Sequence, residues 1–451
     1  MKLNFLRYLR LINRVLNRFF SDPKALILDM ERYMSRKDWG TLQGNGSQLI
    51  SNLGDSLPNV VPLSFVIDPS LSKQPRLNVL IPGMAMKAMS GGPNTAINLT
   101  YRLAAHKIPI RYISTDIPMD ENHEPLWQHF SSLTGIKERF DHVEIACGYD
   151  RSVPLPIGEN DVFFGTAWWT VQMIKYALHQ TKVKQFIYMI QEYEPGLYSW
   201  STLYALALET YGLNFRGVIN ESLLAKYLCQ NKIGRFAEPD FINKCTVFDP
   251  AVDRERFHPN QMSQSSTRVK RLLFYARPNA PRNLYELGIL ALKKAVEQGA
   301  FPSQEWDLRF IGEKLPSIDL GKGVVICQQP WLDYNNYADL LRNSDIGLSL
   351  MLSPHTSYPP LEMASCGALV VTNTFTVKSK EELCSISNNI IPVEPQLESI
   401  VEGLIKAYER SKNLEKRFSD SQNNLPSSWD DSFSNTVNSV LEIWQGCLEN
   451  L

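Results

Sequence analysis

The chain has 451 residues, of which 44% are hydrophobic, and its formal net charge is −1. This length and composition fit about two or three globular domains and exclude a disordered or fibrous protein. A nearly balanced charge provides no basic field for nucleic acid, so we expect no nucleic-acid partner.

The cysteines and the hydropathy pattern predict the cellular compartment. The seven cysteines are scattered and form no CxxC pair. Such usage predicts reduced thiols and argues against a zinc cluster or a disulfide framework. Because no run of about 18 apolar residues is present, we expect no spanning helix and a cytoplasmic protein.

Residues 1–20 differ from the rest of the chain, since they carry five cationic side chains and no acidic one. At helical spacing the arginines fall on one face and large apolar residues on the other. One interpretation is a helix lying peripherally on the anionic inner face of the cell membrane. The other is a helix packed on the protein or on a partner. The interrupting arginines exclude a signal peptide, and we assign residues 1–70 to an N-terminal extension.

Residues 71–250 alternate between strand-like and helix-like segments. The strand-like runs lie at residues 78–82, 110–114, 161–165, 185–190, 217–220 and 246–248. A glycine-rich loop ending at Pro93 precedes a helical pattern that reaches His106. This alternation predicts an α/β domain with a largely parallel sheet covered on both faces.

A polar, proline-containing segment around residues 250–266 predicts a hinge, after which the pattern restarts. Further strand-like runs follow at residues 271–276, 307–312, 323–327, 346–351 and 368–372. We therefore assign residues 251–430 to a second α/β domain. Residues 431–451 contain an amphipathic final helix.

The most informative motif is Ser-Pro-His-Thr-Ser-Tyr-Pro-Pro-Leu-Glu at residues 353–362, ahead of the strand at 368–372. Two prolines suit the first turn of a helix, and Gly367 suits its end. A helix start attracts anions such as a diphosphate, and Glu362 lies one turn inside, within reach of ribose hydroxyls. The alternative is simple capping, because an acid in the first turn stabilises a helix by about 0.3–1 kcal/mol.

This motif resembles the nucleotide-sugar segment of GT-B glycosyltransferases, and its fuller wording resembles the WsaF-type rhamnosyltransferases. The resemblance implies two facing Rossmann-like, doubly wound domains behind the N-terminal helical extension. It also implies that Glu362 binds the nucleotide ribose and that the final helix crosses back to the first domain.

The resemblance further implies how the donor diphosphate is held. Retaining family-four enzymes carry an arginine and, five residues later, a lysine that neutralise it; Arg277 and Arg282 occupy these positions here. Arginine keeps the charge and can grip two phosphate oxygens. Lys314 is a third candidate cation, and Trp331 or Leu332 is a candidate for stacking under the nucleobase. The alternatives are solvated surface cations and a core aromatic residue.

One position departs from the family-four pattern. Those enzymes place a second, sugar-binding glutamate eight positions before the ribose-binding one, where this chain has Pro354. We therefore expect sugar recognition by the four residues that follow, His355, Thr356, Ser357 and Tyr358. A less acidic pocket is compatible with L-rhamnose.

The first domain supplies the remaining candidates. Gly91 and Gly92 allow a backbone loop to approach the donor closely, although a βα turn also needs glycine for geometry alone. Glu192 and Tyr193 follow a strand and are candidates for binding acceptor hydroxyls. Trp168 and its neighbour Trp169 are candidates for stacking on a sugar, with packing at a helix start as the alternative.

The reaction implied by the resemblance is transfer of L-rhamnose from dTDP-L-rhamnose to a bacterial surface polysaccharide such as O-antigen or to a lipid-linked glycan. It would retain the anomeric configuration and use no cofactor and no metal, with Arg277 and Arg282 stabilising the departing diphosphate. The chain has no Asp-x-Asp sequence. An inverting enzyme would need a base, for which Asp116 and Glu192 are available.

Two other functions fit the same residues. One is a transferase or epimerase that uses another nucleotide sugar. The other is a non-catalytic GT-B scaffold in a polysaccharide-assembly complex. Binding of nucleotide diphosphates separates the scaffold from both enzymes.

Overall fold

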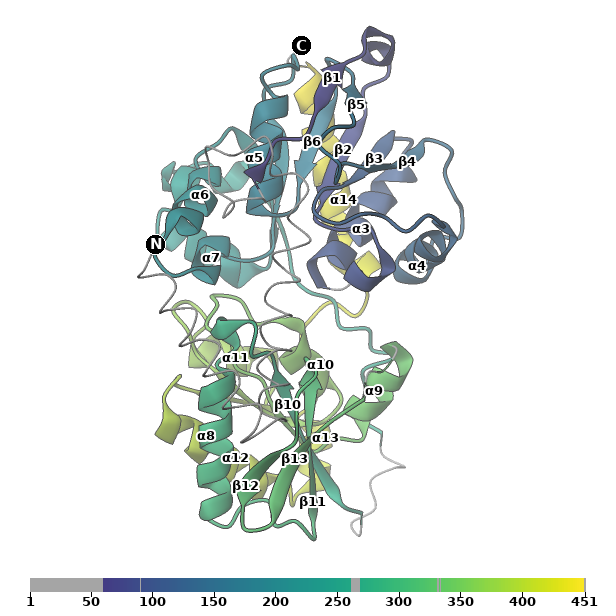
Figure 1. The fold of residues 1–451 in the computed structure, drawn as a ribbon. Helices are drawn as coiled ribbons and strands as arrows, with labels where there is room; N and C mark the ends of the chain where they lie inside the picture. The colour runs from purple at the N-terminus through teal and green to yellow at the C-terminus, as the bar shows by residue number, and fades with distance from the viewer. Residues whose placement is uncertain (1–59, 90, 261–267, 331, 333, 450–451) are drawn as a thin grey trace, which may run out of the picture.

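The computed structural model describes residues 60–89, 91–260, 268–330, 332 and 334–449 (Figure 1). The helix predicted for residues 1–20 and the candidate Trp331 lie outside these residues. Within the described part of the chain, no helix is both long and apolar enough to cross a membrane.

The first domain contains a parallel sheet of seven strands in the spatial order β4-β3-β2-β6-β7-β8-β9. The central strands are buried on both faces, as expected for a parallel sheet covered by helices on both sides. Its strands are β2 (Leu77–Ile81), β3 (Ile110–Ser114), β4 (Val143–Cys147), β6 (Val162–Gly165), β7 (Phe186–Ile190), β8 (Phe215–Asn220) and β9 (Thr246–Phe248). A separate two-stranded parallel sheet pairs β1 (Phe65–Ile67) with β5 (Leu155–Ile157).

The second domain has another seven-stranded sheet, in the order β12-β13-β11-β10-β14-β15-β16, which is parallel except for its edge strand β12. Its strands are β10 (Lys270–Ala276), β11 (Trp306–Gly312), β12 (Ile318–Gly321), β13 (Val324–Gln328), β14 (Ile346–Leu348), β15 (Leu369–Asn373) and β16 (Ile390–Val393). The strand order reverses between β10 and β14. In open α/β sheets, ligands bind beyond the strand ends at such a reversal.

Helices cover both faces of each sheet, as the four core clusters on the two sheets require. In the first domain they are α3 (Gly91–Ala104), α4 (Glu124–Thr134), α5 (Trp168–Ala177), α6 (Thr202–Thr210) and α7 (Ser222–Gln230). In the second they are α8 (Tyr285–Glu297), α9 (Tyr334–Arg342), α10 (Tyr358–Ser365), α11 (Lys380–Ile386), α12 (Leu397–Arg410) and α13 (Leu414–Ser419). Short 3₁₀ helices lie at η3 (Pro69–Lys73), η4 (Met86–Ala88), η5 (Glu194–Leu197), η6 (Gly234–Ala237), η7 (Ile242–Lys244) and η9 (Pro281–Asn283).

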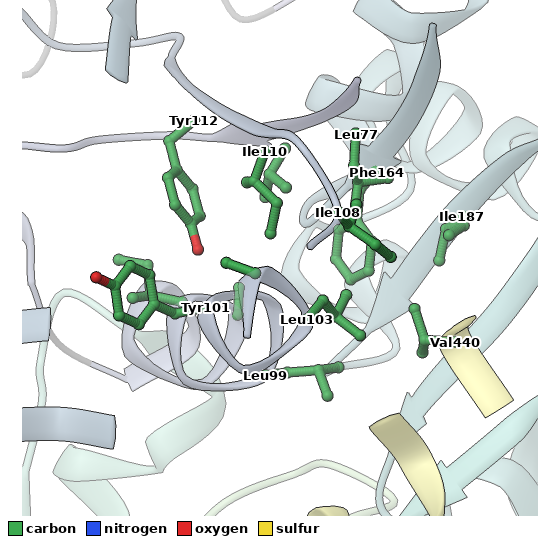
Figure 2. Close-up of a cluster of buried hydrophobic side chains, with 14 of the residues drawn as sticks. Leu77, Leu99, Tyr101, Leu103, Ile108, Ile110, Tyr112, Phe164, Ile187 and Val440 are labelled. Carbon is green, nitrogen blue, oxygen red and sulfur yellow. The ribbon is translucent and has the colours of Figure 1, made fainter. Parts of the chain in front are cut away.

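The last helix, α14 (Trp429–Glu449), follows the second domain in sequence but packs on the first (Figure 1). It contacts α3, β8 and β9. Its buried Val440 joins the cluster between the first sheet and α3, beside Leu99 and Ile187 (Figure 2). The apolar face of this amphipathic helix therefore covers a sheet whose strands come much earlier in the sequence.

Candidate functional site

The loops that follow β10 and β14 lie side by side at the strand reversal of the second sheet. The Leu352 amide donates a hydrogen bond to the Arg282 carbonyl at 2.8 Å, and Asn283 Nδ2 donates to the Leu350 carbonyl at 3.1 Å. These bonds connect the loop that carries Arg277 and Arg282 to residues 353–357. Two segments about 70 residues apart in sequence thus form one surface.

The start of helix α10 has an unusual backbone. Ser357 precedes the helix with φ 70° and ψ 155°, a conformation that costs a non-glycine residue about 1–3 kcal/mol. Its amide donates to His355 Nδ1 at 3.3 Å. Because Pro359 and Pro360 have no N–H, Tyr358 alone supplies a peptide donor among the first three helical residues.

Glu362 lies half-buried in α10, where Tyr337 donates a hydrogen bond to Oε2 at 3.1 Å. Burial raises the pKa of this carboxyl group to about 7, although the Tyr337 bond acts in the opposite direction. A carboxylate has about four lone-pair sites, so it can accept further bonds from ligand hydroxyls. This geometry suits the predicted contact with a ribose.

The predicted cations take different positions. Arg277 Nε lies 3.5 Å from Glu313 Oε1, within the second domain, and its side chain is 41% exposed. Arg282 instead faces the first domain, with Nε 3.3 Å from Glu192 Oε2. Lys314 is exposed, and Leu332 packs partly buried against the second-domain core.

Glu192 makes several of the contacts between the two domains. It follows β7 in the first domain, yet its carboxylate contacts three side chains of the second. Ser353 Oγ donates to Oε1 at 2.6 Å, and His355 Nε2 and Arg282 Nε approach Oε2 at 3.1 and 3.3 Å. The Tyr193 amide also donates to Oε1, at 2.9 Å.

These contacts determine the charge of Glu192. Burial alone would raise its pKa, but the charges of His355 and Arg282 and the hydrogen bonds from His355 and Ser353 lower the pKa to about 2. Burial likewise would lower the pKa of His355, but Glu192 raises it above the usual imidazole value. Glu192 is therefore an anion that is matched by positive charge.

Two more contacts join the predicted sugar-binding loop to the first domain. Glu221, which follows β8, accepts bonds from Thr356 N at 2.8 Å and Thr356 Oγ1 at 2.7 Å. The Tyr358 hydroxyl accepts a bond from Asn220 Nδ2 at 2.8 Å and lies 3.3 Å from Thr95 Oγ1. Thr356 and Tyr358 are thus placed in the domain interface, with protein partners already on their polar atoms.

The first-domain candidates fall into two groups, those near the 191–193 loop and those packed at the start of α5. Gly92 lies beside the 191–193 loop, since its carbonyl accepts a bond from Gln191 Nε2 at 3.2 Å, and Gly91 begins α3 with φ 48°. Tyr193 is half-buried, and its hydroxyl lies 3.3 Å from that of Tyr204.

The structure contradicts the prediction that Trp168 stacks on an acceptor sugar. Its side chain is fully buried, and its indole Nε1 donates to the Tyr198 hydroxyl at 2.9 Å. No ring face is open to a ligand, so packing at the start of α5 is its role. Its neighbour Trp169 is half-buried and donates to Asp116 Oδ2 at 2.7 Å. Burial raises the pKa of Asp116 to about 6.

Sequence reasoning missed two charged residues of this interface. Glu221 directly follows a predicted strand, so the rule that ligands lie beyond strand ends could have identified it. Lys378 gave no such signal. Lys378 is 1% exposed, and its Nζ donates at 2.9 Å to the carbonyl of Met351, just before the loop of residues 353–357. Burial lowers the pKa of Lys378 to about 8, while Glu221 and Glu192 oppose that shift.

Comparison with known proteins gives two family matches. The model described as "WsaF, N-terminal domain" matches residues 76–219, and "WsaF, C-terminal domain" matches residues 270–405. The O-antigen biosynthesis protein RfbC of Myxococcus xanthus is 34% identical over 220 residues, which are 47% of this chain. The chain spans only a small part of that relative, since the match covers 15% of its length.

Solved structures resemble the whole two-domain body. The Anabaena protein Alr3699/HepE in complex with UDP and glucose has a TM-score of 0.57 at 11% identity, with 82% of this chain and 99% of that chain covered. A sucrose-phosphate synthase from Thermosynechococcus elongatus has a TM-score of 0.51 at 10% identity, with 83% and 100% covered. Identities this low establish the fold alone.

Proposed function

Because the chain belongs to the WsaF family and has the GT-B fold predicted from its sequence, we propose that it is a glycosyltransferase of bacterial surface polysaccharide synthesis. Its donor would be a nucleotide diphosphate sugar, and its acceptor a growing glycan such as O-antigen. The name of the Myxococcus xanthus relative supports this assignment.

One observation carries the proposal. The carboxyl group of Glu362 and the loop that carries Arg277 and Arg282 both lie at the strand reversal of the second sheet, between β10 and β14. Tyr337 donates a bond to Glu362, which forms no salt bridge with any of the residues that the structure describes, while Arg282 provides positive charge and His355 a further polar group at the domain interface. A nucleotide diphosphate needs both features, a hydroxyl acceptor for its ribose and cations for its phosphates.

We further propose dTDP-L-rhamnose as the donor and a lipid-linked glycan as the acceptor. The absence of an acidic residue at position 354 supports a sugar that has a methyl group in place of a hydroxymethyl group. A peripheral position on the inner face of the membrane would fit the basic residues 1–20 and such an acceptor.

The mechanism we propose is retaining and metal-independent. Arg277 and Arg282 are catalytic because they stabilise the negative charge that grows on the departing diphosphate. The Tyr358 amide at the start of α10 adds a further donor toward the same charge. A phosphate oxygen of the donor then takes the proton of the acceptor hydroxyl, so no carboxylate base is required.

A thermal-shift panel of nucleotide diphosphates and their sugars tests the donor. We expect dTDP-L-rhamnose to raise the melting temperature most, because a ligand that binds only the folded state stabilises it. A clear preference for UDP or GDP sugars would refute the rhamnosyl assignment but keep the glycosyltransferase. No response to any nucleotide diphosphate would refute both and favour a scaffold.

A further inference from the structure

Three polar groups of the second domain converge on one point of the domain interface. Ser353 Oγ, His355 Nε2 and Arg282 Nε all lie within 3.3 Å of a single carboxylate, that of Glu192. Ser353 is 1% exposed, and the side chains of His355 and Arg282 are 17% and 28% exposed. The three groups form a largely buried polar cluster, with the positive charge of Arg282, that contacts an anion from the opposite domain.

The carboxylate does not satisfy this set fully. Arg282 Nε is buried and has no hydrogen-bond partner within the described residues, since its approach to Glu192 lacks hydrogen-bond geometry. The shortfall is one of geometry, because a carboxylate holds its two oxygens in one plane, whereas a phosphate offers three acceptor oxygens in a tetrahedral arrangement and more negative charge. A phosphate could therefore accept from Ser353, His355 and Arg282 together.

We propose that Ser353, His355 and Arg282 form a binding site for a donor phosphate, and that Glu192 occupies it as a built-in competitor when no donor is bound. The inference rests on the proposed function, because it requires a nucleotide diphosphate as ligand. Glu192 and a phosphate cannot share the site, since two anions within about 4 Å repel each other strongly in a buried environment.

Competition has a measurable consequence. The apparent affinity of a ligand equals its intrinsic affinity multiplied by the fraction of protein whose site is free. In the closed arrangement of the domains Glu192 occupies the proposed phosphate site. It therefore lowers the apparent affinity of the protein for the donor. Because Glu192 comes from the first domain, donor binding also removes one of the contacts that hold the domains together. Displacement of Glu192 thus couples donor binding to movement of the domains.

The variant Glu192→Gln tests the competition, because glutamine keeps the shape and the bond from Ser353 but removes the charge. We expect calorimetry to show about tenfold tighter binding of dTDP and of inorganic pyrophosphate, since the charge that competes for Arg282 is gone. Thymidine, which has no phosphate, should bind unchanged. Ser353→Ala should weaken dTDP binding in the same assay.

A matched variant separates competition from domain loosening. Glu221→Gln weakens the neighbouring contact with Thr356 but leaves the anion on Arg282 and His355 in place. We expect it to leave pyrophosphate affinity within about twofold. Equal tightening in both variants would overturn the inference, as would equal or weaker dTDP binding by Glu192→Gln. Glu192→Asp, whose shorter side chain withdraws the carboxylate, serves as a second variant if the glutamine protein does not fold.

The outcome is separable from that of the proposed function. If the wild-type protein binds no nucleotide diphosphate in calorimetry or thermal shift, the glycosyltransferase assignment fails. If it binds dTDP but Glu192→Gln gives no gain, only the competitor role of Glu192 fails.

Discussion

Burial raises the pKa of the Glu362 carboxyl group to about 7, against the opposing effect of its hydrogen bond from Tyr337. Its ionised form accepts more and stronger bonds from ribose hydroxyls than its protonated form does. Nucleotide binding should therefore strengthen as the pH rises through about 7. An acid with an ordinary pKa would show no such change.

We predict that Glu362→Gln removes this pH dependence and weakens dTDP binding by about tenfold at about pH 8, which corresponds to about 1.4 kcal/mol. Calorimetry at about pH 6 and pH 8 measures it, and the ratio of variant to wild-type affinity cancels the titration of His355. The variant should keep its melting temperature. Parallel pH profiles, or unchanged affinity, would exclude the ribose role.

At the same scale, the motif in residues 353–362 shows what a sequence can and cannot reveal about a site. Local rules predicted a role for His355, Thr356 and Tyr358, because helix starts and strand ends have recognisable chemistry. Their pairings were not recognisable: His355 meets Glu192 across 163 residues, and Thr356 meets Glu221 across 135. Such pairings depend on how two domains close, which no local pattern encodes.

At the scale of elements, the buried strands were the most predictable part of the fold. Strands such as β3 and β15 are buried at every residue because helices cover both faces of the sheets. The prediction missed strands at sheet edges or outside the main sheets, where burial is partial and the pattern is weak, namely β1, β4, β5, β12 and β16. Strand β14 also ends at Leu348, three residues before the predicted end.

Glu194 connects three elements of the first domain. Its Oε2 accepts bonds from the Trp168 amide at the start of α5, at 2.7 Å, and from the Tyr188 hydroxyl in β7, at 2.9 Å. Burial raises the pKa of Glu194 to about 8. Since the folded protein holds this proton at pH values where the unfolded chain has lost it, stability falls as the pH rises toward 8.

We predict that Glu194→Gln reduces this loss. Between about pH 6 and pH 8.5 the wild-type free energy of unfolding should fall by about 2 kcal/mol more than that of the variant. Urea unfolding at both pH values measures the difference. Glu209→Gln is the control, because the Lys175 hydrogen bond lowers the pKa of Glu209 and it does not titrate in this range. The same pH response in wild type and Glu194→Gln would contradict the raised pKa.

At the scale of the whole molecule, α14 makes the first domain depend on the end of the chain. Phe433 is 1% exposed, and its ring lies 5.0 Å from that of Phe248 and 4.9 Å from that of Trp429. We predict that Phe433→Ala lowers the stability of the first domain by about 3–5 kcal/mol. The denaturation midpoint followed by circular dichroism measures it. Asn435→Ala, on the exposed face of α14, should change stability by less than about 0.5 kcal/mol.

The Tyr358 hydroxyl takes part in two of the polar contacts that join the two domains. Asn220, which donates to this hydroxyl, is 7% exposed. Tyr358→Phe would leave its amide without this acceptor in the closed form, at a cost of about 1–3 kcal/mol. The ring would keep its edge-to-face contact with Trp429, at 6.1 Å, so packing is preserved.

We therefore predict that Tyr358→Phe shifts the ligand-free protein toward an open arrangement by about tenfold, which raises the radius of gyration in small-angle scattering and speeds amide exchange in residues 353–358. Tyr198→Phe is the matched control, because the Tyr198 hydroxyl accepts its bond from Trp168 within the first domain. It should leave the radius and that exchange rate unchanged. If both variants behave alike, closure does not depend on Tyr358. If only Tyr358→Phe opens the protein, Tyr358, the first residue of α10, also stabilises the closed arrangement of the two domains.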